Sequence, residues 1–343
     1  MEEVNLRGNL RILQRGVPYM GVNISPLVQP NEIEIEKLAG KTLAVDAFNW
    51  IYQFITTIRQ ADGEPLKDSK GNITSHLSGL FYRNMKLLNQ NIRLIYVFDG
   101  KPPEEKNVVR ELRRDVRKEA EEERKQAIER GDYEAARKFA QRSSFIDKQI
   151  IEESKDLLFH MGVPVVQAPS EGEAECAHLC IEKKAWAVAS QDFDSLLFGT
   201  PVLIRSLSYS GKPIEMIELH KVLDQNQLNH DQLISIGVLV GTDYNPGGIK
   251  GIGPKKALKL IKQKPFKEIL KEVQWDFDVD AKHIFEMFKH PNVGDAEIKF
   301  SGPDIEKIKN LLCSKHDFSE ERIDNAFGRA EKAGQKSLSR FFG

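Results

Sequence analysis

Five short apolar runs recur along the first two thirds of the chain, each of a length typical of a buried strand. They are "KTLAVDA" (41–47), "RLIYVFDG" (93–100), "VPVVQAPS" (163–170), "AWAVASQD" (185–192) and "PVLIRS" (201–206). Between them, segments such as 48–59 and 75–88 place apolar side chains at helical intervals. This alternation predicts an α/β fold with a twisted, mostly parallel central sheet flanked by helices.

A highly charged helical segment, about residues 101–160, separates the second and third predicted strands and is too long for a simple crossover. Five basic residues near its start share one helix face: Lys106, Arg110, Arg113, Arg114 and Arg117. Two interpretations stay open at this point, a solvated charged face or a face that meets phosphate groups.

The overall composition adds little about partners. The chain has 343 residues, enough for one large α/β domain with insertions or for two smaller domains. Its 50 Lys and Arg nearly cancel its 51 Asp and Glu, so only local clustering of charge could reveal a nucleic-acid binder. No apolar run approaches the ~20 residues of a membrane span, and the N-terminus has no signal-peptide pattern.

The three cysteines indicate a reducing compartment without a disulfide framework. Cys176 and Cys180 lie four residues apart with His178 between them, but no fourth zinc ligand is nearby. We therefore interpret both cysteines as small buried residues on one helix face.

Carboxylates gather where the predicted strands end. The six residues at these ends are Asp46, Asp99, Glu171, Glu173, Asp192 and Asp194. Because the carboxyl ends of parallel strands share one edge of a sheet, we expect these side chains to converge there. Each acid alone could cap a helix or belong to a turn, but six at matching positions favour a common site.

Such crowding predicts a metal site. Crowded carboxylates repel and raise one another's pKa values, and a multivalent cation relieves the repulsion. Ligands that are all oxygen favour Mg²⁺ or Mn²⁺ over Zn²⁺. Several carboxylates indicate two ions about 4 Å apart, the arrangement used for in-line phosphoryl displacement.

A seventh acid, Asp243, lies in the glycine-rich segment "GTDYNPGGIKGIGPKKAL" (241–258). Pro254 suits the first turn of a helix, whose free backbone amides would hold a phosphate. Lys255 and Lys256 follow directly and add positive charge. We favour phosphate binding over a simple capped turn, although the P-loop pattern GxxxxGK[ST] is absent.

Six blocks, in order, resemble those of the flap endonucleases, structure-specific nucleases of the XPG superfamily: "AVDAFNWIYQF", "NITSHLSGLFYR", "YVFDGKPPE", "APSEGEAE", "SQDFDSLLFG" and the glycine-rich segment. The resemblance implies a 5′ flap endonuclease with 5′–3′ exonuclease activity that cuts near the single-strand/duplex junction. It implies two Mg²⁺ ions, for which Mn²⁺ can substitute, and roles in Okazaki-fragment maturation and long-patch base excision repair. Two alternatives stay open: a non-catalytic junction protein bound to a sliding clamp, and a related nuclease that cuts gaps, bubbles or Holliday junctions.

The resemblance also implies roles for individual residues. The metal ligands would be Asp46, Asp99, Glu171, Glu173, Asp192, Asp194 and Asp243. The basic helix would belong to a helical arch, from which Lys106 and Arg113 reach the scissile phosphate, while Tyr52 stacks on a nearby base. Further DNA contacts would be Arg59, Arg83, Thr74, Gly247, Gly248, Gly251, Gly253, Lys255, Lys256, Phe318 and Arg322.

Two of these groups would form separate elements. The glycine-rich segment would be a helix–two-turn–helix DNA-binding element whose backbone binds K⁺. Thr74, Phe318 and Arg322 would hold a one-nucleotide 3′ flap, although His316 stands where many relatives carry a lysine. The C-terminal "QKSLSRFF" resembles the peptide that docks on the sliding clamp PCNA, through Gln335, Leu338, Phe341 and Phe342.

The same resemblance predicts the domain organisation of a monomer. Its parts would be a single nuclease domain (20–333) and a clamp-binding tail (334–343). The nuclease domain would comprise an N region (20–118), an arch within 101–160, an I region (142–275) and a helical C-terminal part (276–333). We interpret residues 1–19 as a mis-assigned start with Met20 as the initiator; a real extension would instead crowd the DNA path. The short tail favours an archaeal, cytoplasmic protein at the nucleoid, whereas a eukaryotic one would be nuclear.

Overall fold

The computed structural model describes residues 21–60, 63–208 and 211–332. A seven-stranded sheet lies at its centre, in the order β1-β7-β6-β5-β2-β3-β4. Five strands are parallel: β2 (Thr42–Asp46), β3 (Arg93–Phe98), β4 (Val165–Gln167), β5 (Ala187–Ala189) and β6 (Val202–Arg205). These are the five strands that the apolar runs predicted, so the mostly parallel α/β sheet is confirmed.

Two further strands, β7 (Ile214–Glu218) and β1 (Asn31–Ile33), lie at one side of the sheet and were not predicted; β7 pairs antiparallel with both β6 and β1. Most of their residues stay partly or fully exposed, so neither strand forms a continuous apolar run. Strands that face solvent lack the run of buried residues by which the parallel strands were found.

Alternate residues of the central strands enter two separate hydrophobic cores. Leu43 and Val45 of β2 pack on one side of the sheet, and Ala44, which lies between them, packs on the other. In β3, Tyr96 and Val97 divide in the same way. Because both faces are covered, these strands are apolar throughout, as parallel strands usually are.

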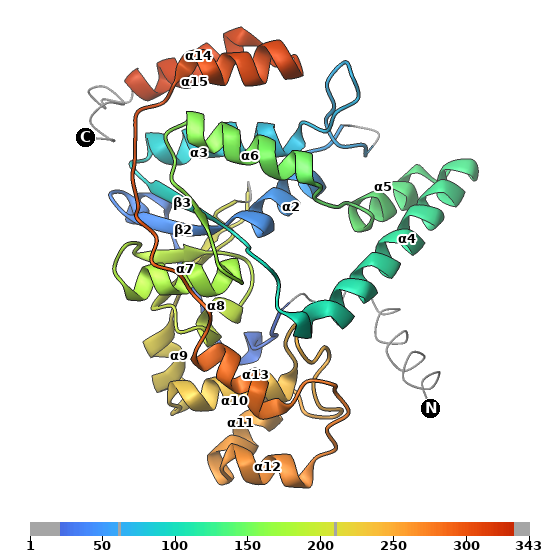
Figure 1. The fold of residues 1–343 in the computed structure, drawn as a ribbon, viewed down its shortest axis with the longest axis vertical. Helices are drawn as coiled ribbons and strands as arrows, with labels where there is room; N and C mark the ends of the chain where they lie inside the picture. The colour runs from blue at the N-terminus through green and yellow to red at the C-terminus, as the bar shows by residue number, and fades with distance from the viewer. Residues whose placement is uncertain (1–20, 61–62, 209–210, 333–343) are drawn as a thin grey trace.

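Helices cover both faces of the sheet (Figure 1). One layer contains α2 (Ala47–Thr57), α3 (Ser75–Asn89), α6 (Lys148–His160), α14 (Ile305–Lys309), the π-helical turn Asn310–Lys315 and α15 (Glu320–Lys332). The other contains α7 (Gly172–Ile181), α8 (Asp194–Leu197), α9 (Leu219–Asn226), α10 (His230–Val240), α11 (Pro254–Gln263), α12 (Phe266–Glu272) and α13 (Ala281–Lys289). The short turns η1 (Ser25–Leu27) and η2 (Ile35–Leu38) precede β2.

Two charged helices project from this body (Figure 1). After the turn η3 (Glu104–Lys106), α4 (Asn107–Glu129) leads outward and α5 (Tyr133–Arg142) packs against it. We call α4 and α5 the arch. The buried apolar side chains described in these two helices are all alanines: Ala120, Ala127, Ala136 and Ala140. The third helix of the charged segment, α6, instead packs on α3 in the body.

Within the described ranges, no helix has the length and apolar character needed to cross a membrane. Residues 291–304 connect α13 to α14 along the side of the body (Figure 1). Backbone hydrogen bonds to Gly162 and His160 hold the end of this connection.

Candidate active site

The parallel strands bring acidic side chains to one edge of the sheet. Asp46 is the last residue of β2 and the N-cap of α2, where it accepts a hydrogen bond from the backbone N–H of Asn49 (3.1 Å). Asp99 follows β3 directly and accepts from the backbone N–H of Gly172 (2.6 Å). A Cβ on Gly172 would lie 2.7 Å from Asp99 Oδ1, so glycine permits this close approach.

The segments around α7 and α8 supply the next four carboxylates. Glu171 is the N-cap residue of α7, and Glu173 lies in its first turn. Asp192 lies between β5 and α8, and Asp194 is the first residue of α8. Asp194 also accepts a hydrogen bond from the backbone N–H of Val22 (2.5 Å).

Asp243 reaches the same place from the loop after α10. Its two oxygens accept from the backbone N–H of Gly21 (3.2 Å) and from Arg113 (2.9 Å). Asp243 lies close enough to Asp192 and Asp194 to repel them electrostatically, and the remaining acids of the edge repel one another in the same way. The structure therefore brings together all seven carboxylates that the sequence selected.

Burial and mutual repulsion raise the pKa values of this cluster. Burial, and then repulsion by Asp99, raise the pKa of Asp46 to about 7. Burial, and then repulsion by Asp194, raise the pKa of Asp192 to about 8. Burial also raises the pKa of Glu173. Full ionisation of the cluster near neutral pH therefore requires compensating positive charge.

Two cations at the base of the arch supply part of that charge. Lys106 Nζ pairs with Glu171, lies 3.5 Å from Asp243 Oδ2 and sits 5.0 Å from the ring centre of Tyr244. Burial lowers the pKa of Lys106, but the two carboxylates more than offset it, so its pKa stands well above the usual value. Burial raises the pKa of Asp243, but Lys106 and Arg113 outweigh it and hold that pKa below the usual value.

Five basic residues at the start of the arch therefore divide into two groups, whereas Arg117 is partly buried and its charge acts on Tyr52. Lys106 and Arg113 face the carboxylates and are partly buried. Arg110, Arg114 and Lys118 are exposed on the same helix. The outer group matches the solvated face that the sequence allowed, and the inner group belongs to the acidic site.

The donor set fits a divalent cation by its chemistry. Its ligand atoms are carboxylate oxygens, which suit Mg²⁺ or Mn²⁺. As they stand, however, no three Asp, Glu, His or Cys side chains within the described part of the chain form a group that could hold a metal ion. Ion pairs to Lys106 and Arg113 and backbone hydrogen bonds engage several of these oxygens instead. The ligand chemistry is present, and the coordination geometry is not preformed.

Comparison with known proteins identifies the family. The XPG N-terminal domain matches residues 20–120, and the XPG I-region matches residues 162–243. Flap endonuclease 1 of Thermococcus onnurineus is 50% identical over 342 residues, which cover 94% of this chain and 99% of that protein. The chain belongs to the flap endonuclease 1 family.

Solved structures agree with the flap endonuclease assignment. The flap endonuclease-1 of Methanococcus jannaschii has a TM-score of 0.75 at 40% identity, covering 91% of this chain and 98% of its own. The catalytic core of Rad2 in complex with DNA substrate has a TM-score of 0.68 at 24% identity, covering 90% and 97%, and shares the fold. The family and fold inferred from the six sequence blocks are thus confirmed.

Among the residues that the family resemblance assigned to DNA, Tyr52 lies on α2 beside the arch. Its ring is partly buried. Burial raises its pKa, and the charges of Arg117, Arg59 and Arg113 partly oppose that rise. Its position between α2 and the arch is compatible with stacking on a base near the carboxylates, which stays a prediction.

The glycine-rich segment makes tight turns before α11. Four of its glycines have positive φ angles of 115°, 78°, 58° and 79°, a region that favours glycine: Gly241, Gly247, Gly248 and Gly251. Gly253 is the N-cap of α11, which begins at Pro254 as the sequence predicted. Lys255 and Lys256 are exposed at this helix start. Phosphate and K⁺ binding here stay predictions.

The residues assigned to a 3′ flap lie around α3 and α15. Thr74 is buried at the N-cap of α3, and Arg322 is exposed on α15. The loop before Thr74 contacts the segment before Phe318 through Asp68 Oδ2 and His316 Nδ1, 3.0 Å apart. His316 is therefore buried against a carboxylate.

Two arginines assigned to DNA are engaged within the protein. Arg83 on α3 donates to the backbone carbonyl of Leu207. Arg59, after α2, donates to three carbonyls in α2, the following loop and the arch. Their DNA contacts stay predictions. The clamp residues Gln335, Leu338, Phe341 and Phe342, together with residues 1–19, lie outside the described residues.

Sequence reasoning missed two side chains that hold the carboxylates. Tyr244 donates its O–H to Glu171 and lies against Lys106. Asn49 donates its side-chain amide to Asp192 (2.9 Å). Each lies within three residues of a predicted metal ligand, and this proximity in the sequence could have identified it. The backbone contacts of Gly21 and Val22 gave no local signal, because their partners lie 222 and 172 residues away.

Proposed function

We propose that this chain hydrolyses a phosphodiester at the base of a 5′ flap in branched DNA, using divalent ions at the carboxylate edge of the sheet. The observation that carries the proposal is the meeting of seven carboxylates with Lys106 and Arg113 of the arch. Metal-assisted phosphoryl transfer needs acidic ligands beside cations that can neutralise a phosphate. Family membership at 50% identity supports the same activity.

The carboxylates would hold two ions. Asp192 and Asp194 would serve the second ion, and the other five acids would complete the two sites. When bound, Mg²⁺, or Mn²⁺ in its place, supplies charge neutralisation and a water of lowered pKa at the scissile phosphate.

Lys106 and Arg113 have different partners without and with substrate in this proposal. Without substrate, Lys106 and Arg113 neutralise Glu171 and Asp243. With substrate, the same charges turn to the scissile phosphate. Tyr52 orients the adjoining nucleotide by stacking.

Finer family properties belong to the same proposal. We infer that the turns at Gly247–Gly251 bind K⁺ beside duplex phosphates, supported by their positive-φ glycines and the exposed lysines that follow. We infer that a monomer docks its C-terminal Q-x-x-L-x-x-F-F peptide on PCNA, supported by that spacing. Roles in Okazaki-fragment maturation and long-patch base excision repair follow from this activity.

A synthetic 5′-flap duplex with Mg²⁺ tests the proposal. We expect cleavage near the junction that leaves a 5′-phosphate and a 3′-hydroxyl, and EDTA should prevent it. A flap that the protein binds normally but leaves intact would overturn the nuclease assignment. Faster cutting of a bubble or a four-way junction would replace the flap with that substrate.

A further inference from the structure

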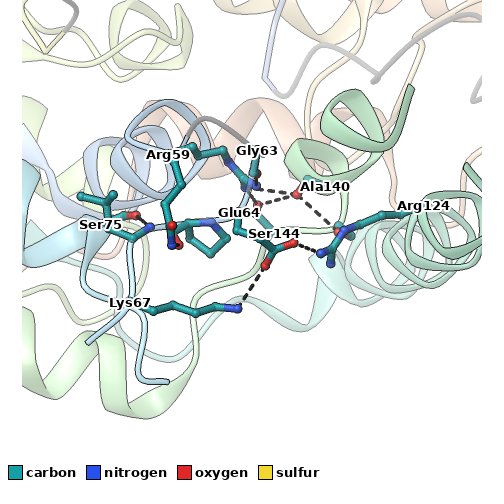
Figure 2. Close-up of polar contacts among 12 residues, drawn as sticks. Arg59, Gly63, Glu64, Lys67, Ser75, Arg124, Ala140 and Ser144 are labelled. Atoms are coloured by element: carbon teal, nitrogen blue, oxygen red, sulfur yellow. Dashed lines mark hydrogen bonds and ion pairs between the residues drawn. The ribbon is translucent and has the colours of Figure 1, made fainter. Parts of the chain in front are cut away.

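The loop after α2 meets the arch through an ion pair (Figure 2). Glu64 in this loop pairs with Arg124, which lies well along α4, 60 residues away in the chain. Arg124 also faces Glu121 of its own helix at 3.3 Å, and Glu64 binds Lys67 at 3.0 Å. The side chains of Arg124 and Glu64 are only 22% and 29% exposed, so water screens this pair less than a fully exposed one.

A second contact holds the C-terminal end of α5, where the arch returns to the body. Arg59 donates to the carbonyl of Ala140 in α5 (3.1 Å) and to the hydroxyl of Ser144 just after it. The same guanidinium donates to the carbonyls of Gly63 (2.7 Å) and Thr56 (3.1 Å). One side chain therefore joins α2, its following loop and the return of the arch. We call Glu64, Arg124 and Arg59 the arch latch.

The loop also lies directly against α5. Gly63 has a φ of +88°, and a Cβ built on it would lie 2.3 Å from Cγ of Arg137. Glycine at this position lets the loop approach the arch closely enough for the contacts of Glu64 and Arg59 on either side of it.

Among the described side chains of the arch, polar contacts are the prominent links to the body. The buried apolar side chains described in α4 and α5 are all alanines, which bury little area. The base of α4 carries Lys106 and Arg113, and Arg124 lies on the same helix about 16 Å beyond Arg113 at 1.5 Å per residue. A helix is stiff over that length. A contact that fixes Arg124 therefore also fixes the orientation of the turns that carry Lys106 and Arg113.

We propose that the arch latch is a positioning device: it orients α4 and thereby places Lys106 and Arg113 over the carboxylates. Glu64 and Arg124 are positioning residues and not catalytic ones, because they act through the helix. The link to cleavage rests on the proposed nuclease function, whereas the orientation of α4 can be measured without DNA.

The variants test the two charges of the Glu64–Arg124 pair. Glu64→Gln and Arg124→Gln each remove one partner, the double variant removes both, and Arg124→Lys retains the positive charge. Glu134→Gln is the matched control, because Glu134 pairs with Lys138 (2.9 Å) on the exposed surface of α5 without touching the body.

The first measurement is amide hydrogen exchange of the full chain without DNA, read by mass spectrometry. We expect exchange in α4 and α5 to become about three- to tenfold faster in Glu64→Gln and Arg124→Gln, since local opening reports the contacts that hold a segment. Strands β2 and β3 should stay unchanged. Arg124→Lys and Glu134→Gln should match the parent, and the double variant should exceed neither single by much, because both remove one interaction.

The second measurement is single-turnover cleavage of the 5′-flap duplex together with its Kd. We expect the rate to fall about three- to tenfold in both single variants while Kd stays within about twofold, because neither Glu64 nor Arg124 is among the residues assigned to DNA. Arg124→Lys should restore the rate.

Three results would overturn the latch. Unchanged exchange in α4 and α5 would show that the contacts do not hold the arch. Equal acceleration in β2 and β3 would show general destabilisation. Faster arch exchange with an unchanged cleavage rate would show that the latch does not position the cations. A parent protein that leaves the flap uncut would instead refute the proposed function, and the exchange result would still decide whether the latch orients α4.

Discussion

The carboxylate edge and the arch are held in place by different forces. The edge is built from strand β2, which pairs with β3 on one side and β5 on the other, and Leu43, Ala44 and Val45 in it are fully buried. The arch is joined to the body by ion pairs and hydrogen bonds, and its described buried apolar side chains are alanines. Acids that repel one another need a rigid frame, whereas cations that exchange carboxylates for phosphate need a support that can adjust.

The largest effect on cleavage should come from a substitution at the carboxylate edge. Asp192→Ala removes a carboxylate of the proposed second ion, and we expect single-turnover cleavage to fall at least about 10²- to 10³-fold, as when one preorganised electrostatic group is lost. Binding of flap DNA should be largely kept. The melting temperature should not fall, because Asp192 lies among carboxylates that repel it. Asp156→Ala on the exposed face of α6 is the control, and equal loss of binding and cutting would instead mean that Asp192 serves folding.

The arch cations should give the next largest effect. Lys106→Gln and Arg113→Gln should each slow cleavage about tenfold to a hundredfold, because each removes one charge from the developing phosphate charge. The Kd for duplex DNA should change far less. Arg110→Gln, which removes an exposed charge from the same helix, is the control for general loss of positive charge. Slowing by Arg110→Gln to the same degree would contradict a special role for the inner pair.

Removing a polar contact within the body should lower the thermal stability and not the cleavage rate. Burial raises the pKa of Asp68, but hydrogen bonds from Asn72 and His316 outweigh it and hold that pKa at about 2. The folded carboxylate binds protons more weakly than the unfolded one, so its contribution is present above about pH 4 and is lost as pH falls toward 2. We expect Asp68→Asn to lower the melting temperature by a few degrees at pH 7, with a smaller difference at pH 3. Thermal melts across this range measure it, and a difference independent of pH would contradict the assignment.

The smallest effect on basal cutting should come from the C-terminal tail. Phe341→Ala with Phe342→Ala should leave cleavage of the flap by the protein alone unchanged. Stimulation by the sliding clamp should be lost, because the apolar plug of the docking peptide is removed. Cleavage assays with and without the clamp check this. Loss of basal cutting would mean that the tail supports the core.

Burial explains which elements were predictable from sequence. The five parallel strands were found because both of their faces are covered, so their apolar runs are uninterrupted. Strands β1 and β7 were missed because they expose much of their length. Six of the acids were found because each follows a predicted strand, whereas Asp243 was found in the glycine-rich segment, and the six sequence blocks contain all seven.

The family, the parallel sheet and the acids at its edge could be predicted from the sequence, because these depend on local apolar patterns and on residues close to them in the chain. The ion pairs of the arch became known only from the fold. It placed Lys106 on Glu171, Arg113 on Asp243 and Arg124 on Glu64, across separations of 65, 130 and 60 residues. Local sequence patterns cannot identify the distant ion-pair partners of a charged helix, because any exposed acid could form the same kind of pair. The packing of the body determines which acids face the arch, and these are Glu64 and the carboxylates of the edge.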